Sequence, residues 1–318
     1  MSATIDSTVI NTDDLFPSIL QSHEKEKLTP WVFKHAESAD LFCIDRWPEE
    51  ESKEFQDIFH LFNSYVSETN LFDASLAVPD PLQAYYPESQ PYDPDRIEPG
   101  MLEDVVGREE TVTLPRKSWE YSTREEFAQL MTLQALVLRG LMESLYQKMG
   151  LRGSEPRLYF PVANHRQSYH IGGQKYAARP DGAVTIRTQR RDLPILSFTS
   201  WFEDQTWGEY LGETLSIMLG QLACNVKPGL GDQEMFVLGF YKRQIFIARG
   251  FFTKDQISRV HSKGCSADET FTIAFTRGYD LSSKEDWDEA VERLVGLLRY
   301  FLSGNAQIGG LQAFFDKS

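Results

Sequence analysis

From residue 122 onward, apolar residues alternate between helical and strand spacing, and this order of elements constrains the fold most. Helices are expected over 124–149, 206–226 and 283–303, and the first of them ends at Gly150. Strands are expected at 157–163, 174–178, 183–188, 195–202, 235–241, 244–252 and 271–276, with a short helix at 253–262 and a loop at 164–173. The pattern predicts an α/β or α+β core in which helices flank a central mixed sheet.

The first 115 residues differ from the rest in charge. They carry all of the excess negative charge of a chain whose net charge is −15, whereas 116–318 are nearly neutral. We expect a mobile leader over 1–22, an amphipathic helix over 51–67, and an extended connector over 79–99, which contain six prolines. The chain is therefore divided into an extended acidic N-terminal region, 1–115, and a core, 116–318.

Within that core, residues 139–191 are strongly basic, with ten Lys and Arg against three acids. Eight of the ten are Arg, which suits bidentate contacts to phosphate. One interpretation is a nucleic-acid contact face, and the other is a solvated surface that pairs with the acidic N-terminal region. The candidates for nucleic-acid contact are Arg166, Arg179, Arg187, Arg190 and Arg191.

Other classes of protein fit the sequence poorly. The three cysteines are far apart and form no CxxC pair, which argues against a disulfide framework or a structural zinc site. The sequence has no secretory signal pattern and no apolar run of about 18 residues, so we expect a cytoplasmic protein without a membrane partner. No cofactor is expected, because Gly172-Gly173 lacks the strand–loop–helix setting of a nucleotide loop.

The stretch 178–204, ARPDGAVTIRTQRRDLPILSFTSWFED, contains the candidate chemistry. Asp181 stands at the head of one expected strand, and a basic turn leads to the next. The second strand offers Ser197 and Thr199 in one register, or Glu203 and Gln205 in the other. Two carboxylates on adjacent strands would converge on a hard cation, but only the second register supplies the second carboxylate.

The order of long helix, strands, Pro-Asp-Gly, basic turn, strand and second long helix resembles the PD-(D/E)XK nuclease superfamily, and its divergent fungal members in particular, over about 123–280. The resemblance implies that Asp181 and an acid on the next strand bind Mg²⁺ while a lysine polarises water. Lys175 is a candidate replacement for the missing lysine. The resemblance also implies that Gln221, in the second long helix, faces the site. We assign no metal ligand.

Three functions remain open. The first is a repurposed nuclease fold that acts on aminoacyl-tRNA, including Arg-tRNA, to form an arginine-containing cyclodipeptide, because the chain resembles the fungal arginine-containing cyclodipeptide synthases in general character. Acyl transfer needs an oxygen nucleophile or a base, and acids to seat a cationic amino acid. The residues considered for these tasks are Ser197 and Thr199 as nucleophiles, Glu203, Glu209 and Glu213 as partners of the cation, and Trp201 as a stacking surface.

The second function is a catalytically inactive nuclease-like protein that binds nucleic acid or serves as a scaffold. The third is a Mg²⁺-dependent nuclease that uses Asp181, Glu203 and Lys175. For Trp201, packing against the following helix is the alternative to substrate stacking.

Overall fold

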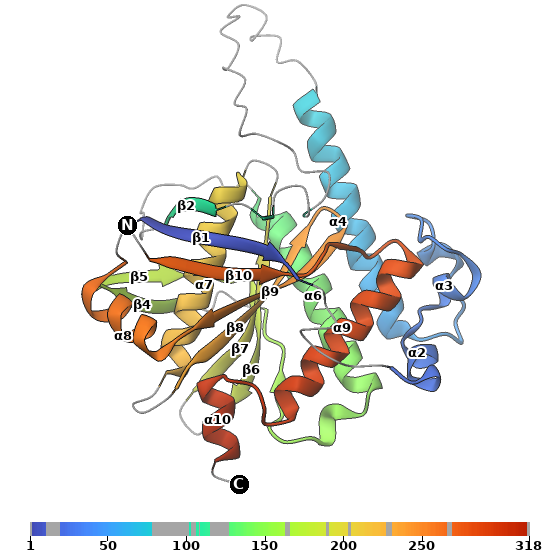
Figure 1. Ribbon diagram of the computed structural model, residues 1–318. Coiled ribbons are helices and arrows are strands. Elements are labelled where there is room, and N and C mark those ends of the chain that lie inside the picture. The colour runs from blue at the N-terminus through green and yellow to red at the C-terminus, as the bar shows by residue number, and fades with distance from the viewer. Residues whose placement is uncertain are drawn as a thin grey trace, which may run out of the picture.

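A computed structural model describes most of the chain (Figure 1). The described residues are 2–10, 20–77, 102, 106–107, 109–114, 127–162, 166–188, 191–202, 205–226, 231–265 and 269–316, and their side chains are described except over 70–77. The connector expected over 79–99 lies outside these ranges, as do Arg190 and Glu203.

A mixed sheet runs through the described part of the chain, with strand order β2-β1-β10-β9-β8-β7-β6-β3 and with β11 paired to β9 (Figure 1). The strands are β1 (Ser2–Val9), β2 (Glu109–Thr113), β3 (Leu158–Tyr159), β6 (Gly182–Arg187), β7 (Asp192–Ser200), β8 (Gln233–Tyr241), β9 (Gln244–Phe252), β10 (Thr270–Phe275) and β11 (Tyr279–Asp280). A separate hairpin consists of β4 (Gln167–Ile171) and β5 (Gln174–Ala178). The expected class, a mixed α/β protein with helices around a central sheet, is confirmed.

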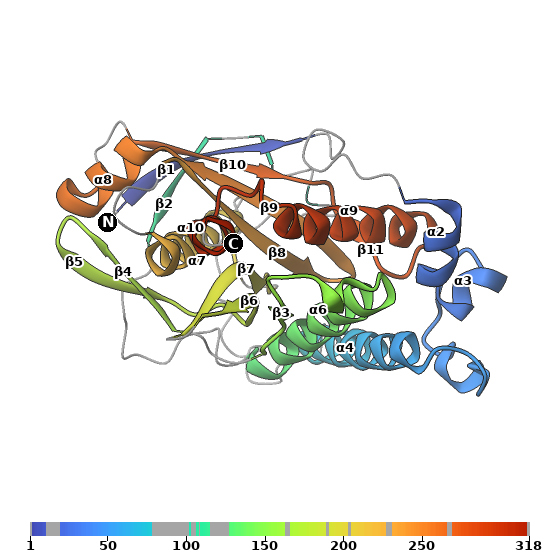
Figure 2. The ribbon, with the colours of Figure 1, turned by 90° about the horizontal axis from the view of Figure 1, so that it is seen from below.

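Helices lie on both sides of the sheet (Figure 2). On one side α4 (Lys53–Ala77), α6 (Ala128–Lys148) and α9 (Lys284–Leu302) share an apolar core with β6, β7 and β8. On the other side α7 (Trp207–Asn225) and the hairpin share a second core with β1, β2 and β10. The remaining helices are α2 (Ser22–Leu28), α3 (Trp31–His35), α8 (Lys254–Lys263) and α10 (Gly309–Phe315), with 3₁₀ turns at Ile44–Arg46 and Leu151–Gly153.

The elements with the strongest apolar periodicity form where the sequence predicts them. The helix expected over 283–303 is α9, and the apolar side chains at helical spacing all lie in the core: Trp287, Val291, Leu294, Leu298 and Phe301. The helix expected over 206–226 is α7, which begins after a capping box between Thr206 and Glu209. A buried stripe at a spacing of three to four residues is a sufficient signal for α9, whereas α7 is buried on nearly all sides and is indicated by its capping box and its apolar character.

The elements that form the candidate site are, in chain order, α6, β3, β6, β7, α7 and β8. Strands β3, β6 and β7 pair antiparallel in succession, and β7 then pairs parallel with β8. A parallel pair needs a crossover, and α7 supplies it. This order brings the head of β6, the end of β7 and the inner face of α7 together.

The N-terminal residues depart from expectation. The leader predicted over 1–22 is wrong, because Ser2–Val9 form β1 between β2 and β10, with Thr4 beside Thr270. Every second residue of β1 is buried, but only Ala3 and Ile5 of these are apolar, so the alternation is weak in the sequence. Since β1 and β2 belong to the central sheet, the N-terminal region is joined to the core. The helix expected over 51–67 is α4, which runs on to Ala77.

The loop expected over 164–173 is wrong for 167–171, which form β4. Gly172 and Gly173 have φ of 56° and 77° and make the two-residue turn into β5. This backbone conformation favours glycine and is typical of tight hairpins. The strand expected over 157–163 is limited to Leu158–Tyr159.

Candidate functional site

The half-buried carboxylate of Asp181 is held against the end of β7. Its Oδ2 accepts a hydrogen bond from the backbone N–H of Ser200 at 2.9 Å, and its own backbone N–H donates to the Phe198 carbonyl at 2.9 Å. The next residue, Gly182, has no room for a side chain, since a Cβ would meet the Phe198 ring at 2.7 Å. The Pro-Asp-Gly sequence is therefore explained in part by close packing between β6 and β7.

In the first of the two registers, Ser197 of β7 stands at the position of the second carboxylate, and the second register rests on Glu203, outside the described residues. Gln167 Nε2 donates to the Ser197 hydroxyl at 3.4 Å, and this hydroxyl donates to Gln221 Oε1 at 3.2 Å. These three side chains, which we call the polar seam, join β4, β7 and α7, and none is more than 3% exposed. Ser197 is thus a buried link between two amides and is closed to a substrate.

Two further hydroxyls near Asp181 are buried. Within the described part of the chain, Thr199 Oγ1 and Ser200 Oγ have no hydrogen-bond partner. Burial raises the pKa of the Tyr210 phenol, the neighbouring Thr214 hydroxyl lowers it, and the Asp181 carboxylate raises it again. The Ser200 backbone N–H and the Tyr210 phenol are thus two neighbours of Asp181, and in the first register the lysine position corresponds to the fully buried Thr199.

The structure does not bring Lys175 to Asp181. Lys175 is exposed on β5 opposite His170, and the strand rises about 3.3 Å per residue, so Lys175 lies about 10 Å along the strand from Ala178. Glu203 is outside the described residues. Among the residues that are described, no three His, Cys, Asp or Glu side chains gather as a metal ion would require.

The predicted substrate-binding residues have structural partners. Glu209 completes the capping box of α7, and Glu213 accepts a hydrogen bond from Gln205 Nε2 at 3.0 Å. Trp201 is 2% exposed and stacks on Tyr241 with ring centroids 4.3 Å apart. Packing is therefore the better interpretation of Trp201, and Gln221 belongs to the polar seam through its bond to Ser197.

The predicted nucleic-acid contacts fall into two places. At the β6–β7 turn, Arg187 pairs with Asp192 at 3.1 Å and covers the Tyr159 ring, while Arg191 donates to the Cys224 carbonyl at 2.8 Å. Arg166 and Arg179 instead flank the hairpin and are exposed. The first group lies at the β6–β7 turn, and the second belongs to a separate surface.

That surface is the outer side of the hairpin. Ser168 lies opposite Ala177 and His170 opposite Lys175, so these four side chains share the side that faces away from α7. Extending the register by one pair places Arg166 and Arg179 on the same side. We call Arg166, His170, Lys175 and Arg179 the basic hairpin face. All four are exposed, and the hairpin itself contains no acidic residue.

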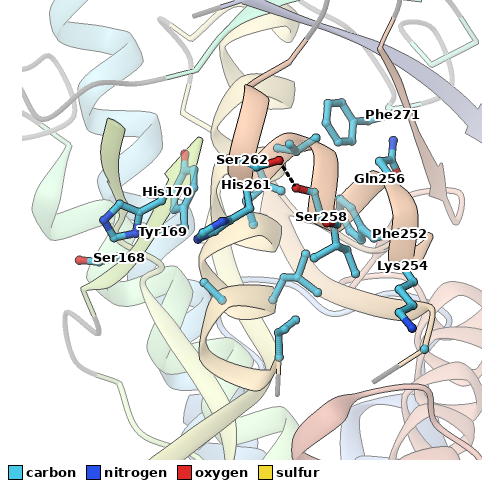
Figure 3. A pocket seen from close by; sticks show the side chains of 17 residues that line it. Ser168, Tyr169, His170, Phe252, Lys254, Gln256, Ser258, His261, Ser262 and Phe271 are labelled. Atoms are coloured by element: carbon cyan, nitrogen blue, oxygen red, sulfur yellow. Dashed lines mark hydrogen bonds between the residues drawn. The ribbon is translucent and has the colours of Figure 1, made fainter. Parts of the chain in front are cut away.

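A half-open pocket of about 680 Å³ lies beside this face, between β4, α7 and α8 (Figure 3). Its walls carry apolar side chains from α7, α8, β9 and β10, together with Lys254, His170 and His261. The rings of His170 and His261 lie 6.1 Å apart at one end, and Lys254 lies at the other (Figure 3). The volume and the apolar lining are typical of a small-ligand site.

No protein-family model matches the sequence, and no curated protein matches it either. Within the described ranges, no helix has the length and apolar character needed to cross a membrane.

Sequence reasoning missed the hairpin, and with it Gln167, Tyr169 and the pocket. Tyr169 hydrogen-bonds to Ser216 of α7 at 2.7 Å, and burial raises the pKa of its phenol. A signal was present, because Gln167, Tyr169 and Ile171 alternate with polar residues and lead into Gly172-Gly173. A glycine pair between two short alternating runs is typical of a two-residue hairpin.

Proposed function

We propose that this chain binds nucleic acid through a PD-(D/E)XK-like core that no longer hydrolyses it. The observation that carries the proposal is the polar seam: Ser197, 0% exposed, holds two amides where the resemblance requires a metal-binding carboxylate. Two-metal or one-metal hydrolysis needs carboxylates that reach the cation from adjacent strands. A buried serine between two glutamines supplies neither charge nor access.

The order of elements supports the PD-(D/E)XK-like part of the proposal. The long helix α6, the antiparallel strands β3, β6 and β7, the crossover helix α7 and the parallel strand β8 follow one another as the resemblance implies. Asp181 stands at the head of β6, beside the end of β7. The acid that begins the motif is thus retained, although its expected partner is replaced.

The basic hairpin face supports the nucleic-acid part. Its exposed cations lie on one side of two paired strands, at a spacing set by the strand register. Phosphate contacts by Lys and Arg supply most of non-specific nucleic-acid binding. The net charge of −15 resides chiefly in 1–115, so it does not oppose binding at this face.

Anisotropy of labelled tRNA and of a single-stranded RNA tests the proposal. The variant is Arg166→Gln/Lys175→Gln/Arg179→Gln, and the control with the same loss of charge is Lys27→Gln/Lys53→Gln/Arg152→Gln, at exposed sites on α2, α4 and the 151–153 turn. Each lost phosphate contact lowers the salt slope of binding by about one unit, so the hairpin variant is expected to lose about three. Equal salt dependence of RNA binding in the variant and the control would show that the basic hairpin face does not contact the nucleic acid.

Hydrolysis is tested separately. Incubation with RNA and DNA in Mg²⁺ or Mn²⁺ is expected to leave both intact. Cleavage that disappears in Asp181→Asn would contradict the loss of hydrolysis and restore the nuclease interpretation with Asp181 and Glu203.

A second candidate is transfer of the aminoacyl group of aminoacyl-tRNA, with an arginine-containing cyclodipeptide as product. It is favoured by the retained acid, since the half-buried Asp181 carboxylate beside Ser200 and Tyr210 keeps a base in the site after the metal-binding partner is replaced. Charged tRNA, including Arg-tRNA, is incubated with the protein and the products are weighed by mass spectrometry. A diketopiperazine that requires Asp181 supports this candidate, and its absence across all amino acids rejects it while leaving nucleic-acid binding intact.

A further inference from the structure

One edge of β4 is unpaired and opens into the 680 Å³ pocket. Ile171 pairs with Gln174 across the two-residue turn, so the backbone groups of 171, 169 and 167 face β5. Those of Ser168 and His170 face the other way, and both residues line the pocket. Within the described part of the chain, the N–H and C=O groups of these two residues have no hydrogen-bond partner.

The pocket is closed at the turn end of this edge. The Gly172 N–H donates to the Val260 carbonyl of α8 at 3.1 Å, and a Cβ on Gly172 would meet the Gly264 backbone at 3.2 Å. A strand that pairs with Ser168 and His170 cannot continue past this contact. An added chain must therefore end beside His170.

A group that ends there lies beside two imidazole rings, which can donate hydrogen bonds. His170 and His261 lie side by side at the closed end, and Lys254, seven residues before His261 on α8, lies about 10 Å away (Figure 3). Among the residues that the structure describes, no acidic side chain lines the pocket. The nearby Asp232 carboxylate accepts the backbone N–H of Lys254 at 2.8 Å from outside the lining. This arrangement favours a carboxylate over an ammonium group.

The floor of the pocket is apolar. Leu219 and Leu222 of α7 line it together with Val226, the residue after the helix, and Phe252 and Phe271 stand on the side of the sheet. Side chains of an added strand alternate between the two sides, so one residue in two would rest on this floor. An apolar residue next to the chain end would bury surface there.

We propose that the pocket binds the carboxyl-terminal end of an extended apolar peptide, which adds as a strand to the free edge of β4. The edge pairs with the peptide backbone, the floor receives an apolar side chain, and the closed end with His170 and His261 holds the terminal carboxylate. Addition of a strand to an exposed sheet edge is a general mode of peptide recognition. This site adjoins the basic hairpin face and shares His170 with it, but it uses the free edge of β4 and the pocket rather than Arg166, Lys175 and Arg179.

An array of pentapeptides with free carboxyl termini, each ending in one of the twenty residues, tests the proposal with the labelled full chain. Peptides that end in an apolar residue are expected to bind, and the same peptides with a terminal amide are expected to bind at least about tenfold more weakly, the loss of one charge-assisted hydrogen bond. N-methylation of successive amides is expected to weaken binding at alternate positions only, because alternate residues pair with the edge. An array without specific binding would overturn the proposal.

Two variants locate the binding on the molecule. Ala223→Trp places a large ring in the pocket from an exposed position on α7 and is expected to abolish peptide binding, whereas Ala128→Trp, at an exposed position on α6, is not. His261→Gln is expected to reduce the preference for the carboxylate over the amide. If decanoate displaces the peptide and the N-methyl scan is flat, the pocket takes apolar acids without pairing to β4, and the proposal fails. RNA affinity of Ala223→Trp is expected to match that of the unaltered protein.

Discussion

The strand β4 contributes to two regions of opposite character. Its inner side places Gln167 in the polar seam, where three buried side chains from β4, β7 and α7 bond to one another. Its free edge places Ser168 and His170 in a half-open pocket, where their backbone groups have no hydrogen-bond partner among the described residues. Ser197 and Gln221, two candidate site residues in the sequence, are buried in the polar seam. The solvent-accessible polar groups lie at the free edge of β4, in the pocket.

The largest effect that separates the two regions is expected from a buried charge. Ser197→Asp puts a carboxylate between Gln167 and Gln221 with no cation to pair it, which is expected to destabilise the protein by about 3–5 kcal/mol. Ser258→Asp, in the exposed wall of the pocket, is expected to change stability by less than about 0.5 kcal/mol. Urea unfolding of both variants measures the difference. Similar losses would mean that the seam is open to solvent.

A smaller effect is expected from added volume at two glycines of α7. A Cβ at Gly220 would meet Gln167 Cβ at 2.8 Å, so Gly220→Ala is expected to push the hairpin away and cost about 1–3 kcal/mol. Gly208 has nothing within 4 Å, so Gly208→Ala is expected to stabilise the helix by up to about 1 kcal/mol. Thermal unfolding of both variants shows whether each substitution raises or lowers the stability of the protein. A stabilising Gly220→Ala would show that the hairpin packs loosely on α7.

The bonds within the seam are expected to couple Ser197 and Gln221 by about 1 kcal/mol. A double-mutant cycle of Ser197→Ala and Gln221→Leu measures this coupling. The same cycle with Gln256→Leu, a pocket residue, is expected to be additive because Gln256 has no contact with Ser197. Coupling energies of equal size in both cycles would mean that Ser197→Ala loosens the protein as a whole, and that the coupling does not come from the bond to Gln221.

The smallest effect concerns an ion pair outside the pocket lining, in which Arg259 of α8 is paired with Glu269 at 2.7 Å. The hydrogen bond from Arg259 lowers the pKa of the Glu269 carboxyl below 4.5. A carboxyl whose pKa falls on folding adds stability above its unfolded pKa and loses it as the pH drops through the folded one. Glu269→Gln is therefore expected to be less stable than the unaltered protein at about pH 6, and the gap is expected to close toward about pH 3. A gap that is constant with pH would contradict the ion pair.

The sequence predicts those parts of the fold that local spacing determines. The helices α7 and α9 and the strands β8 and β9 are predicted to within two residues, because their buried residues recur at regular intervals. β4 is missed although its alternation into Gly172-Gly173 is a usable local signal, because Gln167 on its buried side is polar, and β1 is missed because its buried side contains Ser7, a polar residue that only tertiary partners explain. Local pattern carries no information about a partner strand that is far away in the chain.

Some features of the candidate site can likewise be predicted from the sequence, and others cannot. The position of Asp181 at the head of β6 and the inward orientation of Gln221 follow from the order of elements. The closure of Ser197 does not, because it depends on the hairpin being laid across α7, where Gly220 permits the contact. The sequence also gives no signal for the pocket, which forms between elements that belong to three separate parts of the chain.

The pairing of β1 with β10 has a consequence for biosynthesis. β1 cannot pair with β10 until Thr270, the partner of Thr4, has been synthesised. A ribosome that adds about 5–20 residues per second needs on the order of ten to fifty seconds to make the intervening chain. During that time Ile5 and the unpaired backbone of β1 are exposed to other nascent chains. Molecular chaperones are expected to protect the exposed β1 segment from aggregation during this time. The recombinant yield of the protein is therefore expected to rise when chaperones are co-expressed.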